Sequence, residues 1–280
     1  EMANTIDWGE ASVNNTNGYG KGATNNTIRW GKIYESSSSG ETNITGASGF
    51  SNTLSTRFDG VDDYVTMGNV ASLRFDYNDA FSFSFWLNRT TSSDTTCILS
   101  RADKDSPFSG YIVLVQDNKI YFRLRNDSSN NFFMQGTVNI PNETWTHYVV
   151  TYDGSNSVSG MTLYKNGLSE TVTTTSSGTV SSYASLSLPF NLATRDNLPN
   201  IAYNGAMDEV SAYNVELSAS AVTTIYNSGA PNDLTGTSGL VSWWRMGDND
   251  TYPTITDNQG SNNGTMTNMS SGNFITNVPT

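Results

Sequence analysis

Alternation of apolar and polar residues with a period of two recurs in several short segments, and it constrains the fold more than any other feature. In FSFSFWL at 81–87, phenylalanines alternate with serines and Trp86. In NKIYFRLR, apolar residues alternate with Tyr121, Arg123 and Arg125. Successive side chains of a strand point to opposite faces, so each segment places one face in a core and the other outside. The pattern predicts a sheet protein.

Turn residues separate these segments. Asp153-Gly154 ends the strand in WTHYVVTYDG, and Asn166-Gly167 in LYKNG is typical of a tight hairpin, because both residues tolerate positive φ. The only convincing helix is SASAVTTIYNSG, near 218–228, with Ser218 as its cap and Gly229 as its stop. We therefore expect an all-β antiparallel fold with one short helix.

The alternation also predicts which side chains form the core. We expect burial of Phe58, Phe81, Phe83, Phe85, Ile120, Phe122, Leu124, Tyr148, Val150, Leu163, Val210 and Ile225.

Composition excludes several partners and sites. The formal net charge of -12 would repel nucleic acid and anionic membranes. No apolar run approaches the roughly 20 residues that span a bilayer, and the first residues, EMANTIDWGEAS, show no signal peptide. Cys97 is the only cysteine, which excludes an internal disulfide and a Cys-rich metal site, as is typical of a chain assembled in a reducing cytosol.

Five short patches, taken together and in order, resemble the laminin-G-like branch of the concanavalin A-like lectin/glucanase superfamily. They are FDGVDDYV, FSFSFWL, WTHYVVTYDG, LYKNG and MDEVSAYNVELSASAV, and the resemblance covers residues 55–230. It implies a two-sheet antiparallel jelly-roll sandwich that acts as a binding module.

The resemblance divides the chain into three parts. Residues 1–56 form an arm rich in Asn, Ser, Thr and Gly, residues 57–230 the jelly-roll domain, and residues 231–280 a C-terminal segment. That segment contains GLVSWWRMGD, which resembles the stretch that usually opens such a domain. Either the jelly roll is circularly permuted, with Leu240–Met246 as a strand of the sandwich, or a second copy is cut short. Too little sequence follows for a second sandwich, so we favour permutation.

Several pieces of the chain are similar in texture to proteins of marine tailed bacteriophages. They are SVNNTNGYG, NNTIRWGKIYESSSSG and the WWRMGD stretch. This similarity implies a protein of the virion surface, with other virion proteins as partners.

The sequence offers little support for catalysis. Glucanases of the superfamily place acids on one strand as Glu-x-Asp-x-x-Glu, and that pattern is absent. Asp62-Asp63 and Asp208-Glu209 are adjacent pairs whose members point to opposite faces of a strand. His147 is the only histidine, so neither a zinc site nor a Ser/His/Asp site is expected.

Calcium is the metal that the residues favour. It binds carboxylate and carbonyl oxygens, which Asp-Gly turns provide. The resemblance places the strands of Asp59, Asp63 and Asp208 side by side, so these three could share one structural Ca2+. The alternative is that the aspartates cap turns by accepting backbone N–H bonds.

Carbohydrate is the ligand that the sheet surface favours, because sugars stack on aromatic rings while polar side chains bond their hydroxyls. Trp86, Tyr121, Arg123 and Arg125 lie on faces turned away from the core, and Arg101 lies near a strand end. We predict that these five bind a host-surface glycan. The alternative is a solvated sheet or the interface of a homo-oligomer.

Three functions follow. The first is a non-catalytic virion appendage, such as a tail fibre or capsid-surface component, that binds glycan. The second is a purely structural virion protein, and the third is a secreted carbohydrate-active enzyme or its binding module.

Overall fold

The computed structural model contains two compact units, Glu1–Ser51 and Asn52–Thr280. Of residues 1–49 it describes the backbone of five strands. The remaining described residues are 50–90, 95–103, 105, 109–183, 187–195 and 201–280. The side chains of most of the predicted arm, 1–56, therefore lie outside the described residues.

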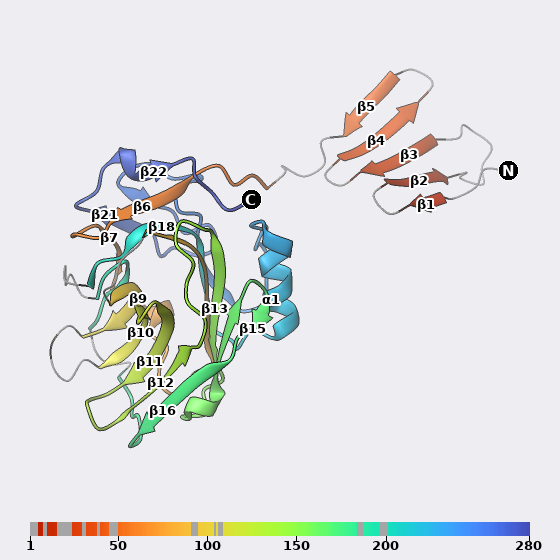
Figure 1. Cartoon of the computed structure of the whole chain (residues 1–280). Helices are drawn as coiled ribbons and strands as arrows, with labels where there is room; N and C mark the ends of the chain where they lie inside the picture. The colour runs from red at the N-terminus through yellow and green to blue at the C-terminus, as the bar shows by residue number, and fades with distance from the viewer. Residues whose placement is uncertain are drawn as a thin grey trace. The chain divides into compact units, whose positions relative to one another are not determined.

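The first unit is an antiparallel sheet in which each strand pairs with the next along the chain (Figure 1). Its strands are β1 (Thr5–Asp7), β2 (Glu10–Asn15), β3 (Thr24–Arg29), β4 (Lys32–Ser37) and β5 (Gly40–Ile44).

The second unit is a sandwich of two antiparallel sheets, as the alternation predicted (Figure 1). The nine-stranded sheet has the order β16-β12-β11-β10-β9-β17-β7-β21-β20. Its strands are β7 (Tyr64–Gly68), β9 (Thr96–Ala102), β10 (Gly110–Gln116), β11 (Lys119–Arg125), β12 (Asn131–Gly136), β16 (Val172–Ser177), β17 (Phe190–Leu192), β20 (Thr254–Ile255) and β21 (Gly264–Thr267).

The eight-stranded sheet has the order β15-β14-β13-β8-β18-β6-β22, with β19 also paired to β18. Its strands are β6 (Ser55–Asp59), β8 (Phe81–Arg89), β13 (Thr146–Tyr152), β14 (Met161–Lys165), β15 (Leu168–Ser169), β18 (Asn204–Tyr213), β19 (Leu240–Trp244) and β22 (Phe274–Ile275). Short 3-10 turns lie at Ala71–Leu73, Val158–Gly160, Asn227–Gly229 and Ser271–Asn273.

The core lies between the two sheets. All twelve side chains predicted to be buried are buried, which confirms the predicted strand faces. Phe83 is fully buried, and its ring lies 5.4–5.9 Å from those of Phe75, Phe81, Tyr111 and Phe190. Aromatic residues on alternate strand positions therefore supply much of the apolar area that stabilises the sandwich.

The one α-helix, α1 (Ala219–Tyr226), confirms the predicted helix near 218–228. Ser218 caps it by accepting a hydrogen bond from the Ala221 N–H (3.2 Å). It ends earlier than the predicted stop at Gly229, because Asn227 adopts the left-handed conformation, φ 47°. On the outer face of the eight-stranded sheet, Tyr226 stacks on Trp86 at 5.8 Å between centroids.

The C-terminal segment contributes strands to both sheets. Strand β19 pairs antiparallel with β18 through Val210 and Trp244, while β21 pairs with β7 and β22 with β6. Residues 240–244 thus form a strand of the sandwich, two residues shorter than the predicted 240–246. That the jelly roll is circularly permuted stays a prediction. Within the described part of the chain, no helix is long and apolar enough to cross a membrane.

Candidate functional site

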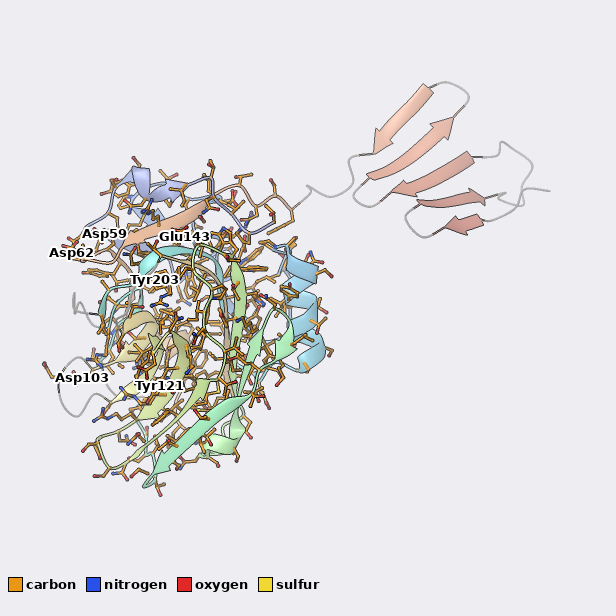
Figure 2. The ribbon with its side chains drawn as sticks, in the orientation of Figure 1. Asp59, Asp62, Asp103, Tyr121, Glu143 and Tyr203 are labelled. Carbon is orange, nitrogen blue, oxygen red and sulfur yellow. The ribbon has the colours of Figure 1, made fainter. Side chains whose placement is uncertain are left out.

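The outer face of the nine-stranded sheet carries an aromatic pair beside basic residues. We call Tyr121, Arg123, Arg125 and Phe133 the β11 strip. The rings of Tyr121 and Phe133 stack with centroids 4.6 Å apart, and the Arg123 guanidinium lies 5.8 Å from the Tyr121 ring. Strand register places Arg123 opposite Phe133, and Tyr121, labelled in Figure 2, lies two residues before Arg123 on the same face of β11. The β11 strip offers stacking area and hydrogen-bond donors together.

Positive charge accumulates at this strip. Burial, and after it the charges of Arg123 and Arg195, lowers the pKa of the Arg125 guanidinium. Burial also lowers the pKa of Arg195, and the charge of Arg123 adds to that effect. In a chain of net charge -12, such a grouping is a local exception that favours electron-rich oxygens of a ligand.

Two of the five predicted ligand-binding residues lie elsewhere. Trp86 also points away from the core, but from the eight-stranded sheet, where Tyr226 covers it and leaves it 3% exposed. Arg101 is fully buried and pairs with Tyr111, a core residue, so it points inward. Of the predicted five, Tyr121, Arg123 and Arg125 share the outer face of the nine-stranded sheet. The two arginines are half-buried there, whereas Tyr121 is only 4% exposed, so half-buried Phe133 is the accessible ring of the stacked pair.

Three acids gather in the loop between β6 and β7. Single carboxylate oxygens of Asp59, Asp62 and Asp63 lie within 4.8 Å of one another. The Asp59 N–H donates to Asp63 Oδ2 (3.1 Å) and Asn273 Nδ2 donates to the same oxygen (3.0 Å). Burial, and then the charge of Asp59, raises the pKa of Asp63. An all-oxygen donor set of this spacing fits Ca2+, whose ligands lie 2.3–2.6 Å from the ion.

Asp208, the third predicted calcium ligand, is not part of this group. Strand register pairs Asp59 with Asn204, so Asp208 lies four residues farther along β18. Its carboxylate accepts a hydrogen bond from Asn52 Nδ2 (2.8 Å) instead. The strands of Asp59 and Asp208 are neighbours, as the resemblance implied, but the register separates the two side chains.

Asp208 and Glu209 form a buried acidic pair at an irregularity in the pairing of β18 with β8. Glu209 has a φ of 47° and contacts Arg245, whose Nε lies 3.1 Å from its Oε1. Burial, followed by the charge of Glu209, raises the pKa of Asp208 well above its ordinary value. Burial raises the pKa of Glu209 to about 7, although Arg245 opposes the shift.

The single histidine is structural, as the sequence indicated. His147 is fully buried, and its Nε2 lies 2.8 Å from Ser84 Oγ. Burial lowers its pKa to about 3, so the ring is neutral at physiological pH.

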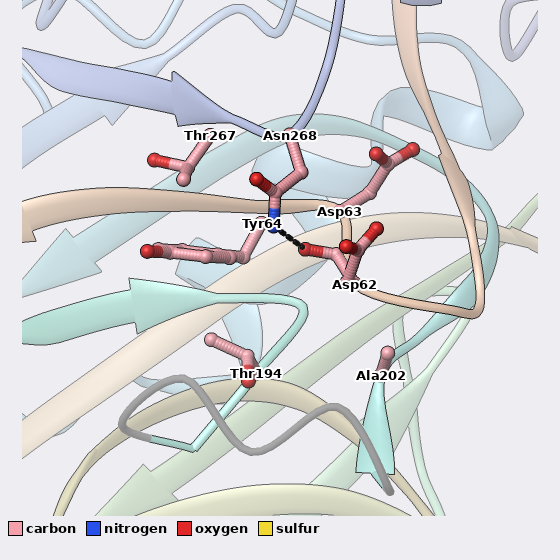
Figure 3. Close-up of a pocket in the computed structure, with 7 residues that line it drawn as sticks. All are labelled: Asp62, Asp63, Tyr64, Thr194, Ala202, Thr267 and Asn268. Atoms are coloured by element: carbon pink, nitrogen blue, oxygen red, sulfur yellow. Dashed lines mark hydrogen bonds between the residues drawn. The ribbon is translucent and has the colours of Figure 1, made fainter.

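A pocket of about 300 Å³ opens beside the acidic loop (Figure 3). Tyr64 of β7 and Thr267 of β21 are register partners on the outer face of the nine-stranded sheet. Asn268 Nδ2 donates to the backbone oxygen of Asp62 (3.1 Å), which fixes the loop against the end of β21. The full lining is Asp62, Asp63, Tyr64, Thr194, Ala202, Thr267 and Asn268.

No sequence pattern predicted the residues on the far side of this pocket. Thr267 and Asn268 belong to the C-terminal segment, and only strand pairing between β21 and β7 brings them to Tyr64. The β11 strip and the pocket nevertheless share one sheet face. The outer row that crosses the strands between them contains Arg123, Ile112, Ser100, Asn191 and Thr66.

The model of the Laminin_G_3 family, described as the concanavalin A-like lectin/glucanases superfamily, matches residues 59–223. The chain belongs to this superfamily. The expected family, and with it the two-sheet jelly roll, is therefore confirmed. No curated protein matches the chain.

Two solved structures of the same fold show how far the likeness extends. A Bacteroides ovatus protein assigned as carbohydrate binding has a TM-score of 0.59 and 14% identity, over 91% of this chain and 69% of that one. The CBM40 of Ruminococcus gnavus IT-sialidase, bound to alpha2,3 sialyllactose, has a TM-score of 0.51 and 12% identity, over 63% and 99%. At these identities the likeness concerns the fold alone.

Proposed function

We propose that this chain is a non-catalytic carbohydrate-binding protein whose ligand lies on the outer face of the nine-stranded sheet. The observation that carries this proposal is the half-buried ring of Phe133, which stacks on the buried Tyr121 and lies opposite Arg123 in the strand register. The apolar face of a sugar ring packs on aromatic rings, and guanidinium N–H groups donate to hydroxyl or carboxylate oxygens.

Two of the structures of similar fold support this ligand class, because one is assigned as carbohydrate binding and the other holds sialyllactose. The grouping of Arg123, Arg125 and Arg195 favours glycans that carry carboxylate or sulfate groups over neutral ones. Acidic glycans should therefore rank highest among the sugars that bind.

A glycan array combined with a hydrolysis assay on the same preparation tests the proposal. Binding without turnover supports a binding protein, and turnover supports the alternative of a carbohydrate-active enzyme. Neither binding nor turnover favours a purely structural protein whose sheet face contacts an assembly partner. Arg123→Gln should weaken binding, whereas Arg74→Gln, at an exposed arginine that directly follows the 3-10 turn Ala71–Leu73, should not.

We also propose that the glycan-binding unit is displayed on a virion surface, in contact with other virion proteins. The texture of the Asn-, Thr- and Gly-rich segments supports this context. Mass spectrometry of purified phage particles tests it, because a virion protein must copurify with the capsid or tail.

We also propose a structural calcium ion in the loop between β6 and β7. Asp59, Asp62 and Asp63 would hold a structural Ca2+, which would fix the loop that walls the pocket beside Tyr64. The ion would neutralise three adjacent carboxylates that otherwise repel one another.

A further inference from the structure

A second polar pocket lies on the opposite side of the sandwich. It opens on the outer face of the eight-stranded sheet, two residues along β8 from the Trp86 that α1 covers. Its volume is about 270 Å³. Its lining consists of Arg57, Asn88, Thr90, Glu143, Gly205, Ala206, Ile275 and Asn277.

The floor of this pocket follows from strand register. Ala206 of β18 pairs with Arg57 of β6 on one side and with Asn88 of β8 on the other. The small side chain of Ala206 leaves a depression between a guanidinium and a carboxamide. Their strands are two spacings apart, so the Cα atoms of Arg57 and Asn88 are about 10 Å apart.

Glu143 forms the wall beyond Asn88. Its N–H donates to the backbone oxygen of Arg89 (2.8 Å), and Asn142 forms a bridge with Arg89, so Glu143 is held beside the end of β8. Its φ is 50°, a left-handed conformation that favours Gly or Asn over a residue with a long side chain. A strained backbone that presents a carboxylate to a pocket points to a role in binding.

The charges of the pocket are available to a ligand. Among the described residues, the side chains of Arg57, Asn88 and Glu143 have no hydrogen-bond or ion-pair partner. Asn277 is fixed, because its Oδ1 accepts a hydrogen bond from Trp145 Nε1 (3.1 Å). That bond leaves the Asn277 Nδ2 group as a donor of defined orientation.

We propose that this pocket binds a small zwitterion of the amino-acid type, with its carboxylate on Arg57 and its ammonium group on Glu143. The pocket has a cation and an anion at opposite ends, so a ligand of one net charge would meet a like charge at one of them. No aromatic ring lines it, so it lacks the stacking surface that the β11 strip offers a sugar. The site is independent of the proposed glycan site, because the two lie on different sheets.

Binding of ω-amino acids to the full chain, measured by calorimetry, tests this proposal. The probes are glycine, β-alanine, γ-aminobutyrate and ε-aminocaproate, whose charges are progressively farther apart. Because Arg57 and Glu143 are held on separate strands, one length should bind best. N-acetylation or amidation of that probe should each weaken binding at least about tenfold, since each removes a charge-assisted hydrogen bond.

Variants assign the effect to the pocket. Arg57→Gln and Glu143→Gln should each weaken binding of the best probe at least about tenfold. The matched variants Arg74→Gln and Glu216→Gln, at exposed positions outside the pocket, should leave it unchanged. The proposal is overturned if no probe binds, if the blocked probes bind as well as the free one, or if Arg57→Gln binds like the unaltered chain. Calorimetric binding of neutral saccharides that Arg57→Gln abolishes would also overturn it.

Discussion

The buried pair Asp208 and Glu209 predicts that the sandwich loses stability as the pH rises from about 5 to about 7.5. The unfolded chain releases the Glu209 proton near its ordinary pKa of 4.5, whereas the folded chain retains it up to about 7. Between these values the folded state binds more protons, so raising the pH favours unfolding. Asp208 acts in the same direction, because burial raises its pKa as well.

The magnitude follows from the shift. Each pKa unit corresponds to about 1.4 kcal/mol, so Glu209 alone should lower the free energy of unfolding by about 3 kcal/mol across this range. For a protein of ordinary stability, that is a substantial fraction of the total. Arg245 limits the loss, since it stabilises the ionised form at 3.1 Å.

Chemical unfolding at the two pH values, monitored by tryptophan fluorescence, measures this loss. The side chain at position 209 is uncharged at both pH values in Glu209→Gln. The change in the free energy of unfolding between the two pH values should therefore be smaller in this variant by about 3 kcal/mol. The control is Glu143→Gln at an exposed glutamate, which should retain the full difference. The reasoning fails if the unaltered protein is equally stable at both values, or if Glu209→Gln shows the same pH dependence.

Three further predictions concern the fold and the metal. Phe83→Ala leaves a cavity at a fully buried position and should lower the free energy of unfolding by about 3–5 kcal/mol, measured by chemical unfolding. The control Val61→Ala, at an exposed position, should change it hardly at all. A loss below about 1 kcal/mol for Phe83→Ala would contradict the packing. Deleting residues 239–280 removes four strands that pair in both sheets and should cause aggregation on size-exclusion chromatography; a monomer with an unchanged melting temperature would contradict this. Ca2+ at a hundredfold excess over its Kd should stabilise the chain by about 2.7 kcal/mol. Asp63→Asn should remove this stabilisation, whereas Asp208→Asn should retain it. Identical melting curves with and without chelator would exclude a bound ion.

The sequence predicted strand faces well but could not assign strands to sheets. Alternation places both Trp86 and Tyr121 away from the core, and the structure agrees. The two residues lie on opposite sides of the sandwich, because β8 and β11 belong to different sheets. That assignment depends on pairing between distant segments, which periodicity within a segment does not encode.

Irregular pairing explains the position of Arg101. Simple alternation from the outward Cys97 would place residues 99 and 101 outward as well. In the pairing with β10, however, Leu99 lies opposite Val113 and Cys97 opposite Leu114. β9 therefore has one extra residue between these two pairs, and the alternation of inward and outward side chains is reversed after it. Arg101 therefore points into the core beside Tyr111. A bulge of one residue reverses the faces of the rest of a strand and leaves no clear mark in the sequence.

Strand register also determines which acidic side chains lie close together. The Asp-Gly turn brought Asp59 and Asp63 together as expected, because they are close in sequence. The pocket beside them needed β21 next to β7, a contact between segments some two hundred residues apart. Local chemistry was readable from the sequence, whereas the far wall of the site required the tertiary structure.

The binding of an acidic glycan to Phe133→Ala, measured by calorimetry with the best ligand from the array, tests the central claim most directly. The ligand stacks on the half-buried Phe133 ring in our proposal, so this variant should weaken binding at least about tenfold. Tyr252→Ala, at an exposed tyrosine outside the β11 strip, should bind like the unaltered chain. Equal affinity for the unaltered chain and Phe133→Ala would contradict the account.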